Sequence, residues 1–191
     1  EGRKVAAAFA GEPRQAHGAG IAFVREMTTE WIPQPVDAAV TSAAGYPLDL
    51  TFYQVVKGVT AASHIVKPGG IILLMAACDE GPGAHEFSRL LIQSPDPASF
   101  LETIFKLPVK IDQWQLEKLA LVCQTHKVWW YTPGLPKEYH ANIWGRIFPS
   151  AADALQSLAD TVPADAEVAV IPEGPYVFAR PRSGAVELVE A

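Results

Sequence analysis

The fold is decided by residues 45–58, which read Gly-Tyr-Pro-Leu-Asp-Leu-Thr-Phe-Tyr-Gln-Val-Val-Lys-Gly. This stretch joins an apolar run at 36–44, which predicts a buried strand, to a segment at 51–66 with the pattern of a helix. A second apolar run at 71–78 follows, and strand, loop, helix and strand in about 45 residues make one βαβ unit. Ligands of open α/β sheets lie outside the carboxyl ends of the strands. The polar side chains just after residue 44 are therefore candidates for a site.

Other segments continue the alternation of strands and helices. Further strands are predicted at 4–10, 127–131, 167–171 and 177–179, and further helices at 13–27, 85–93, 97–105, 111–125 and 149–162. The continuous apolar character of the strands suits a sheet that is covered on both faces. We therefore expect an α/β fold with a mainly parallel, doubly wound sheet in three layers, and one domain over residues 1–191.

Composition excludes several classes of protein. The net charge is −6, and no cluster of lysine or arginine is dense enough for nucleic acid. No apolar run reaches the roughly 18 residues that cross a membrane. Cys78 and Cys123 both lie in apolar runs, which favours buried thiols and a reducing, cytoplasmic location, although a disulfide between them stays open. The chain begins at Glu1 without a methionine, so we expect a piece of a longer protein.

Gln54 and Lys57 are the leading site residues. They are three positions apart and share one face of the predicted helix, whose start Thr51 or Asp49 could cap. A cation and an amide near a helix start suit an anionic ligand, because the lysine neutralises a carboxylate and the amide binds an oxygen or a hydroxyl. The alternative is a solvent-facing polar stripe on an amphipathic helix.

Two further segments offer weaker candidates. The glycines of the loop at 79–84 could let backbone amides approach an anion, but an ordinary turn is the stronger interpretation. Asp112 is predicted to cap the helix at 111–125 with Gln115 in a capping box, which places Trp114 in the first turn. Trp114 would there exclude water from a small substrate, or else pack in the core. The scattered histidines include no pair at metal-ligand spacing.

Several motifs together resemble the carboxy-terminal domain of the nickel-dependent lactate racemase family. They are Ala-Gly-Tyr-Pro-Leu-Asp at 44–49, Tyr-Gln-Val-Val-Lys-Gly at 53–58, Lys-Pro-Gly-Gly at 67–70 and Asp-Gln-Trp-Gln at 112–115. The likeness runs through most of the chain, and the motif at 45–58 is long and specific.

The resemblance implies a racemase or epimerase of 2-hydroxy acids. Family members use a nickel-pincer nucleotide, held between two domains, to remove a hydride from the substrate and return it to the other face. The acid and base histidines belong to the amino-terminal domain, so this domain by itself is expected to be inactive. Gln54, Lys57 and Trp114 match the family's substrate-binding positions: Lys57 offsets the carboxylate charge, Gln54 orients the substrate and Trp114 shields the site. Tyr46 and Asp49 are possible lining residues of the cleft.

Two other classes of function remain as alternatives. One is a stand-alone α/β module that binds a small anion or nucleotide. The other is a purely structural partner domain, which predicts no pocket beside Gln54 and Lys57.

Overall fold

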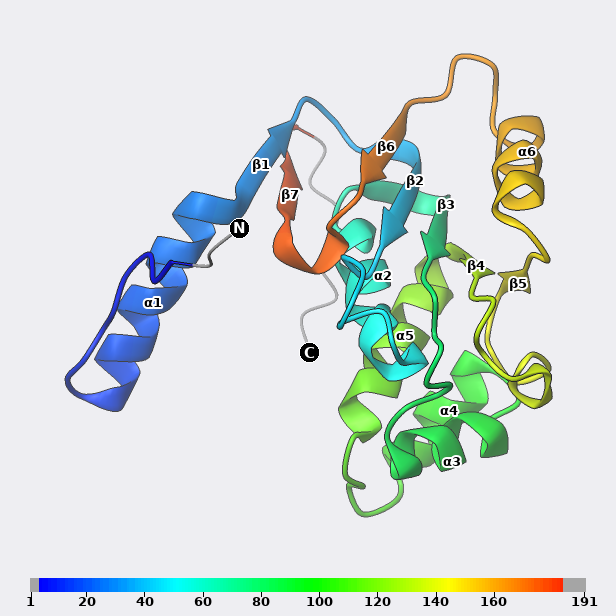
Figure 1. The fold of residues 1–191 in the computed structure, drawn as a ribbon, viewed down its shortest axis with the longest axis horizontal. Coiled ribbons are helices and arrows are strands. Elements are labelled where there is room, and N and C mark those ends of the chain that lie inside the picture. Colours follow the sequence, from blue (N-terminus) through cyan, green and yellow to red (C-terminus); the bar gives the residue numbers. More distant parts are fainter. Residues whose placement is uncertain (1–3, 184–191) are drawn as a thin grey trace.

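The computed structural model describes residues 4–183 and has a five-stranded sheet at its centre (Figure 1). The strand order is β5-β4-β3-β2-β6, and every neighbouring pair is parallel. A separate parallel pair joins β1 to β7. The strands are β1 (Thr29–Ile32), β2 (Val36–Ser42), β3 (Val66–Met75), β4 (Lys127–Tyr131), β5 (Arg146–Ile147), β6 (Val168–Ile171) and β7 (Phe178–Pro181).

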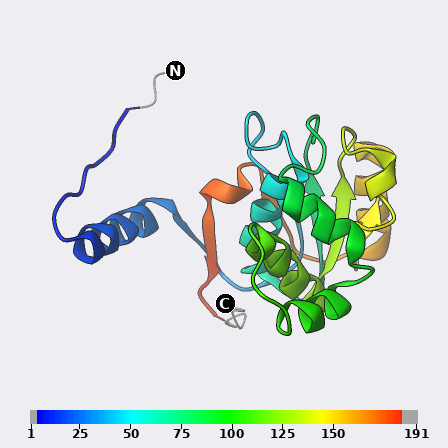
Figure 2. The same ribbon diagram turned by 90° about the horizontal axis from the view of Figure 1, so that it is seen from below.

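Helices cover both faces of this sheet, as Figure 2 shows. One face packs against α2, α3, α4 and α5, and the other face packs against α6. The parallel, helix-flanked α/β architecture predicted from the sequence is confirmed. The helices are α1 (Pro13–Thr28), α2 (Phe52–Ser63), α3 (His85–Gln93), α4 (Pro97–Ile104), α5 (Gln113–Thr125), α6 (Ala151–Thr161) and the 3₁₀ turns η1 (Lys137–Tyr139) and η2 (Gly174–Tyr176).

The predicted βαβ unit is β2, α2 and β3. The apolar side of α2 is buried against the sheet, with Val55, Val56 and Val59 fully covered. Gly58 allows this close approach, because a Cβ at that position would collide with the backbone oxygen of Ser42 and lie 3.0 Å from Leu74 Cδ1. The glycine that follows Lys57 therefore sets how deeply α2 sits on β2.

The loops after β2 and β3 are joined by a ladder of backbone hydrogen bonds. The Cys78 N–H donates to Asp49 O and the Glu80 N–H donates to Leu50 O, both at 2.8 Å. The first two N–H groups of α2, on Phe52 and Tyr53, donate to the carbonyls of Gly81 and Pro82 at 2.9 and 3.0 Å. These bonds hold the start of α2 at a fixed position.

Side-chain capping of α2 was predicted wrongly. Thr51 occupies the N-cap position, but no side chain makes a capping hydrogen bond there. Neither Thr51 nor Asp49 therefore caps α2 through its side chain. Carbonyls of the loop at 79–84 satisfy the first N–H groups instead, so this loop turns its oxygens and not its amides toward the helix. The start of α2 consequently offers an anion less than the sequence suggested.

The amino-terminal segment departs most from expectation. Residues 4–10 do not form the predicted strand but an exposed, irregular segment, whose Phe9 ring lies 5.7 Å from the Phe23 ring of α1. Figure 1 shows α1 projecting away from the sheet as an arm, with β1 and β7 at its base. Residues 30–35, for which the sequence predicted neither a strand nor a helix, contain most of β1. The strand pattern at 4–10 failed because no neighbouring strand is available to pair with it.

Both cysteines are free thiols, and the disulfide that the sequence left open does not form. Burial raises the pKa of the Cys78 and Cys123 thiols to about 12, with Asp49 and Asp79 adding to the effect at Cys78. Both side chains therefore act as small apolar groups in the packing. Within residues 4–183, no helix has the length and apolar character needed to cross a membrane.

Candidate functional site

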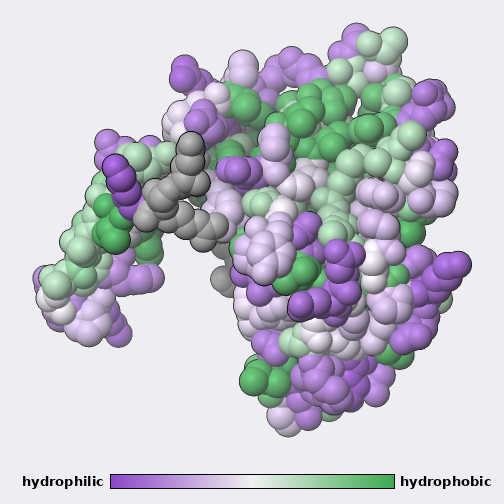
Figure 3. Space-filling model, viewed as in Figure 1, coloured by the Kyte–Doolittle hydropathy of each residue, from purple (hydrophilic) through white to green (hydrophobic). Residues whose placement is uncertain are grey.

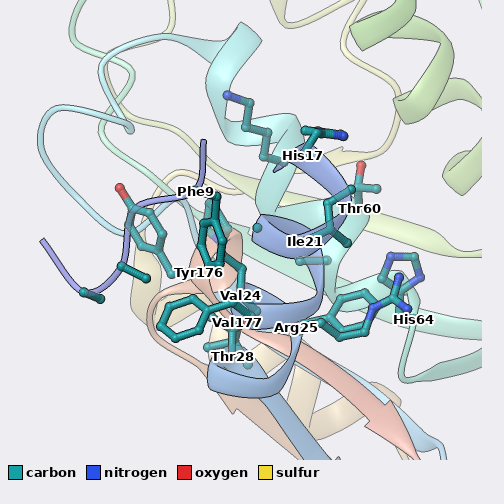
Figure 4. A pocket seen from close by; sticks show the side chains of 18 of the residues that line it. Phe9, His17, Ile21, Val24, Arg25, Thr28, Thr60, His64, Tyr176 and Val177 are labelled. Atoms are coloured by element: carbon teal, nitrogen blue, oxygen red, sulfur yellow. The ribbon is translucent and has the colours of Figure 1, made fainter. Parts of the chain in front are cut away.

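A large open groove separates α1 from the outer side of the α2–α5 helix pair, with a volume of about 1120 Å³ (Figure 4). Lys57, Thr60, Ala61 and His64 line it from α2, at the spacing of a single helix face. Aromatic rings from the arm, from η2 and from β7 close its other sides. The groove thus runs along the flank of the helix pair rather than across the loops at the strand ends.

Lys57 and Trp114 both line this groove. They come from different helices, α2 and α5. Both crossover helices lead back into parallel strands, so they run in the same direction with their starts side by side. Trp114 is 51% exposed and Lys57 is exposed, so both can reach a ligand in the groove. Trp114 is accordingly a wall of the groove and not a core residue.

Gln54 lies one turn before Lys57 and is half-buried. Its Oε1 is fully covered yet has no hydrogen-bond partner among the residues that the structure describes. Leaving a buried acceptor unpaired costs about 1–3 kcal/mol, so such an atom calls for a donor. Gln54 itself does not contribute to the lining of the groove.

Tyr46 and Asp49 lie in the loop after β2 and are not part of the groove lining. Tyr46 is 82% exposed at the tip of the loop. The Asp49 carboxylate accepts a long hydrogen bond of 3.4 Å from the Ala77 N–H, between the two loops of the ladder. Asp49 therefore connects the loops, whereas Tyr46 is free to contact something outside residues 4–183.

Tyr53 links the two helices that carry Lys57 and Trp114. Its ring stands edge-on to Trp114, with 6.2 Å between ring centroids, and its hydroxyl donates to Asp112 Oδ1 at 3.3 Å. The buried amide of Gln115 donates to Tyr53 O at 2.8 Å. Burial and the Asp112 carboxylate raise the pKa of the Tyr53 phenol, which keeps the donating proton in place. Tyr53 was not singled out from the sequence.

These contacts replace the capping box predicted at 112–115. Asp112 has a left-handed backbone (φ 60°), and its side chain does not cap α5. Both proposed members of the box bond to Tyr53 instead. The sequence pattern could not show this, because the competing partner is about 60 positions away in the chain.

The groove is basic although the chain is acidic. Its described lining contains Arg25, Lys57 and Lys118 but no aspartate or glutamate, while the chain has a net charge of −6. Lys118 lies four positions after Trp114 and so shares its face of α5, a spacing that could have identified it from the sequence. A groove with charge of one sign and low-dielectric walls attracts anions.

His64 lies at the far end of the groove, with its ring 6.0 Å from that of Phe178. Burial, with smaller effects from Arg180 and Lys118, lowers the pKa of His64 to about 4, below its usual 6.5. The unfolded chain therefore binds more protons than the folded chain between these pH values, and stability is lost as the pH falls from about 6.5 to 4.

We expect His64→Gln to reduce this loss in titrations of the free energy of unfolding. The slope should decrease by up to one proton, or about 1.4 kcal/mol per pH unit. His85→Gln, at an exposed position, is the control for loss of an imidazole. An unchanged slope in His64→Gln would contradict the assignment.

The fold and the groove define a class: an α/β domain with a parallel sheet and a basic, aromatic-walled groove along the helices α2 and α5. Residues 32–179 match the family model described as "Lactate racemase C-terminal domain". The chain belongs to this family of lactate racemase carboxy-terminal domains.

Two curated relatives are named lactate racemase. The one from Thermoanaerobacterium thermosaccharolyticum is 36% identical over 183 residues, and the one from Lactiplantibacillus plantarum is 32% identical over 178 residues. The matches cover 93% and 91% of this chain but 42% of each relative. The chain thus spans about two fifths of the length of the curated relatives that it matches.

Solved structures support the same placement. The lactate racemase apoprotein from Thermoanaerobacterium thermosaccharolyticum has a TM-score of 0.79 at 34% identity, over 89% of this chain and 41% of that one. A Thermotoga maritima protein has a TM-score of 0.58 at 11% identity, over 88% of this chain and 42% of that one, which is a likeness of fold alone.

Proposed function

We propose that the chain is the substrate-binding carboxy-terminal domain of a racemase or epimerase of 2-hydroxy acids. The observation that carries the proposal is the pairing of Lys57 and Trp114 in one basic groove. An ammonium group stabilises a carboxylate, and an indole wall keeps water away from it. A preceding domain, which the length of the relatives supports, completes the site.

Gln54 has a place in the same scheme. Its Oε1 lacks a donor within residues 4–183 but is covered and outside the groove. The Gln54 side chain therefore has to turn out toward Lys57 before it can accept a hydrogen bond from the hydroxyl of a 2-hydroxy acid whose carboxylate pairs with Lys57. The two contacts together would hold carbon 2 of the substrate in one orientation. A fixed orientation is required if the hydride is to leave one face of carbon 2 and return to the other. We also propose that Tyr46 and Asp49, which lie outside the groove lining, form an edge of the cleft between this domain and the preceding one.

The nickel-pincer nucleotide implied by the family would supply the hydride acceptor for carbon 2. The proposed site residues of this domain, Lys57, Gln54 and Trp114, offer an ammonium, an amide and an indole group. These groups suit an organic anion rather than a metal ion. Among residues 4–183 no group of three His, Cys, Asp or Glu side chains could hold a metal ion. We therefore assign the metal-binding residues, and the acid and base at the substrate hydroxyl, to the preceding domain.

The test uses the full-length protein loaded with cofactor. Either pure enantiomer of lactate should be converted to the racemate, followed by chiral chromatography. In D₂O the product should carry no solvent deuterium at carbon 2, because a transferred hydride does not exchange. Incorporation of deuterium would contradict hydride transfer, and no conversion of any 2-hydroxy acid tested would contradict racemisation. In that case a module that binds small anions becomes the better interpretation.

A further inference from the structure

A second cavity lies between α3, α4 and the loop that leads into α5, with a volume of about 370 Å³. This volume is within the range of pockets that bind small molecules. Among the described residues, none that lines this cavity also lines the groove. Both spaces reach the start of α5, where Gln113 lines the cavity and the next residue, Trp114, lines the groove. The cavity is therefore separate from the proposed substrate site.

The apolar part of the lining is held in place by the core. Phe100 and Ile104 of α4 are 2% and 7% exposed, and Leu90 of α3 lies beside them in the lining. The Phe100 ring packs against that of Trp144, with 5.6 Å between ring centroids. This apolar wall is already formed and can contact the carbon atoms of a ligand without rearrangement.

Three hydroxyl groups in the lining already use their protons. The Ser94 hydroxyl donates to Leu90 O at 2.7 Å. Thr103 donates to Ser99 O at 2.8 Å, and the Ser99 hydroxyl donates to Asp96 Oδ2 at 2.7 Å. A hydroxyl has one proton and two lone pairs, so these oxygens can only accept a further hydrogen bond. This part of the cavity is suited to a ligand with a hydrogen-bond donor.

Gln113 offers the complementary group. The residue is 6% exposed, and its Oε1 accepts a hydrogen bond of 3.1 Å from the Lys110 N–H. Its Nε2 has no hydrogen-bond partner within residues 4–183. Buried polar groups are normally paired, so this amide nitrogen lacks an acceptor that an occupant of the cavity could supply.

Lys110 provides a charge that is not neutralised. The described lining contains Arg89 and Lys110 but no aspartate or glutamate. Glu86, which lies outside the lining, forms a salt bridge with Arg89, and Gln93 accepts a further hydrogen bond from Arg89 at 2.7 Å. Neither salt bridge formed within residues 4–183 involves Lys110. An ammonium group next to an unpaired amide donor favours a carboxylate.

The surroundings of the cavity favour a dissolved small molecule over a protein segment. In Figure 3 the lower part of the main body, where α3 and α4 lie, is mainly hydrophilic apart from small apolar patches. Surfaces that dock proteins usually have larger contiguous apolar areas.

We propose that this cavity is a binding site for a small carboxylate that carries a hydroxyl group on a short apolar chain. The carboxylate lies beside Lys110 and the Nε2 of Gln113. The carbon chain contacts Phe100 and Ile104, and the ligand hydroxyl donates to a hydroxyl oxygen of the lining, on the side of α4. The proposal does not depend on whether the protein racemises such an acid.

Isothermal titration calorimetry of the full-length protein tests the proposal. The titrations use a Lys57→Ala background, which removes the ammonium group of the groove. The probe 2-hydroxy-4-methylpentanoate should give saturable binding. Two matched probes, 4-methylpentanoate without the hydroxyl and 4-methylpentane-1,2-diol without the carboxylate, should each bind about fivefold more weakly or worse.

Two substitutions locate the binding in the cavity. Gln113→Glu keeps the acceptor for the Lys110 N–H but replaces the donor with a negative charge, so the affinity should fall by about tenfold or more. Lys110→Ala, at an exposed position where folding should not suffer, should weaken binding by about fivefold. Lys106→Ala is the matched control, because Lys106 is an exposed lysine of the same loop outside the cavity lining, and it should leave the affinity unchanged.

Three results would overturn the proposal. They are the absence of saturable binding to the Lys57→Ala protein, equal affinities for the three probes, and affinities that Gln113→Glu and Lys110→Ala leave unchanged. Because these titrations measure binding in a background that lacks Lys57, their failure would leave the proposed racemase function untouched.

Discussion

Lys57→Ala should lower kcat/KM for the 2-hydroxy acid by roughly 30-fold to several thousand-fold in the full-length, cofactor-loaded protein. The variant removes the ammonium group that the groove offers to the substrate carboxylate. Truncating one partner of a desolvated charge pair costs about 2–5 kcal/mol, and each 1.4 kcal/mol is a factor of ten. Steady-state kinetics with either enantiomer of the substrate measure the loss.

Lys106→Ala is the matched control, since Lys106 is an exposed lysine after α4 and outside the groove. Its kinetics should equal those of the unmodified protein. Lys57→Arg keeps the charge but moves it onto a larger, planar group, so an intermediate loss is expected. Turnover of Lys57→Ala close to that of the unmodified protein would remove Lys57 from the site.

Gly58→Ala should lower the free energy of unfolding by about 1–3 kcal/mol, the usual cost of overpacking a core. The added methyl group would meet the Ser42 backbone oxygen and the Leu74 side chain, and the backbone oxygen cannot rotate away. Relief requires α2 to move outward from β2, which displaces Lys57 as well. Chemical denaturation measures the loss of stability.

Gly18→Ala provides the control for a glycine-to-alanine change within a helix. Its added Cβ meets nothing within 4 Å, so the substitution should be neutral or slightly stabilising. If Gly58→Ala were equally harmless, α2 would have room to shift and the close contact with β2 would not be a constraint.

Much of the fold could be predicted because it depends on local patterns. The helices at 85–93 and 97–104 and the strand at 127–131 are found where apolar periodicity and proline or serine breaks predicted them. The alternation of these elements was enough to indicate a parallel sheet. The apolar run at 4–10 has the same local pattern but pairs with nothing, and there the prediction failed.

The candidate site was predictable in part. A spacing of three on a helix is enough to place Gln54 and Lys57 on one side of α2. The predicted start of the helix at 111–125 places Trp114 in the first turn of α5, although the capping box that supported this placement does not form. Tyr53, His64 and Phe178 were missed, because their importance comes from contacts between distant segments. The same limit produced the error at Asp112, whose hydroxyl partner lies on another helix.

The sequence by itself determined most of the strands and helices, the βαβ unit around residues 45–58 and the chemical types of the site residues. Apolar periodicity and local backbone preferences act over a few neighbouring positions and are visible in one dimension. Only the tertiary structure decided that Lys57 and Trp114 share a basic groove, that the start of α2 is closed by loop carbonyls and that α1 stands apart as an arm. Those outcomes depend on which distant surfaces can pack and which polar groups find partners, and no short stretch of sequence carries that information.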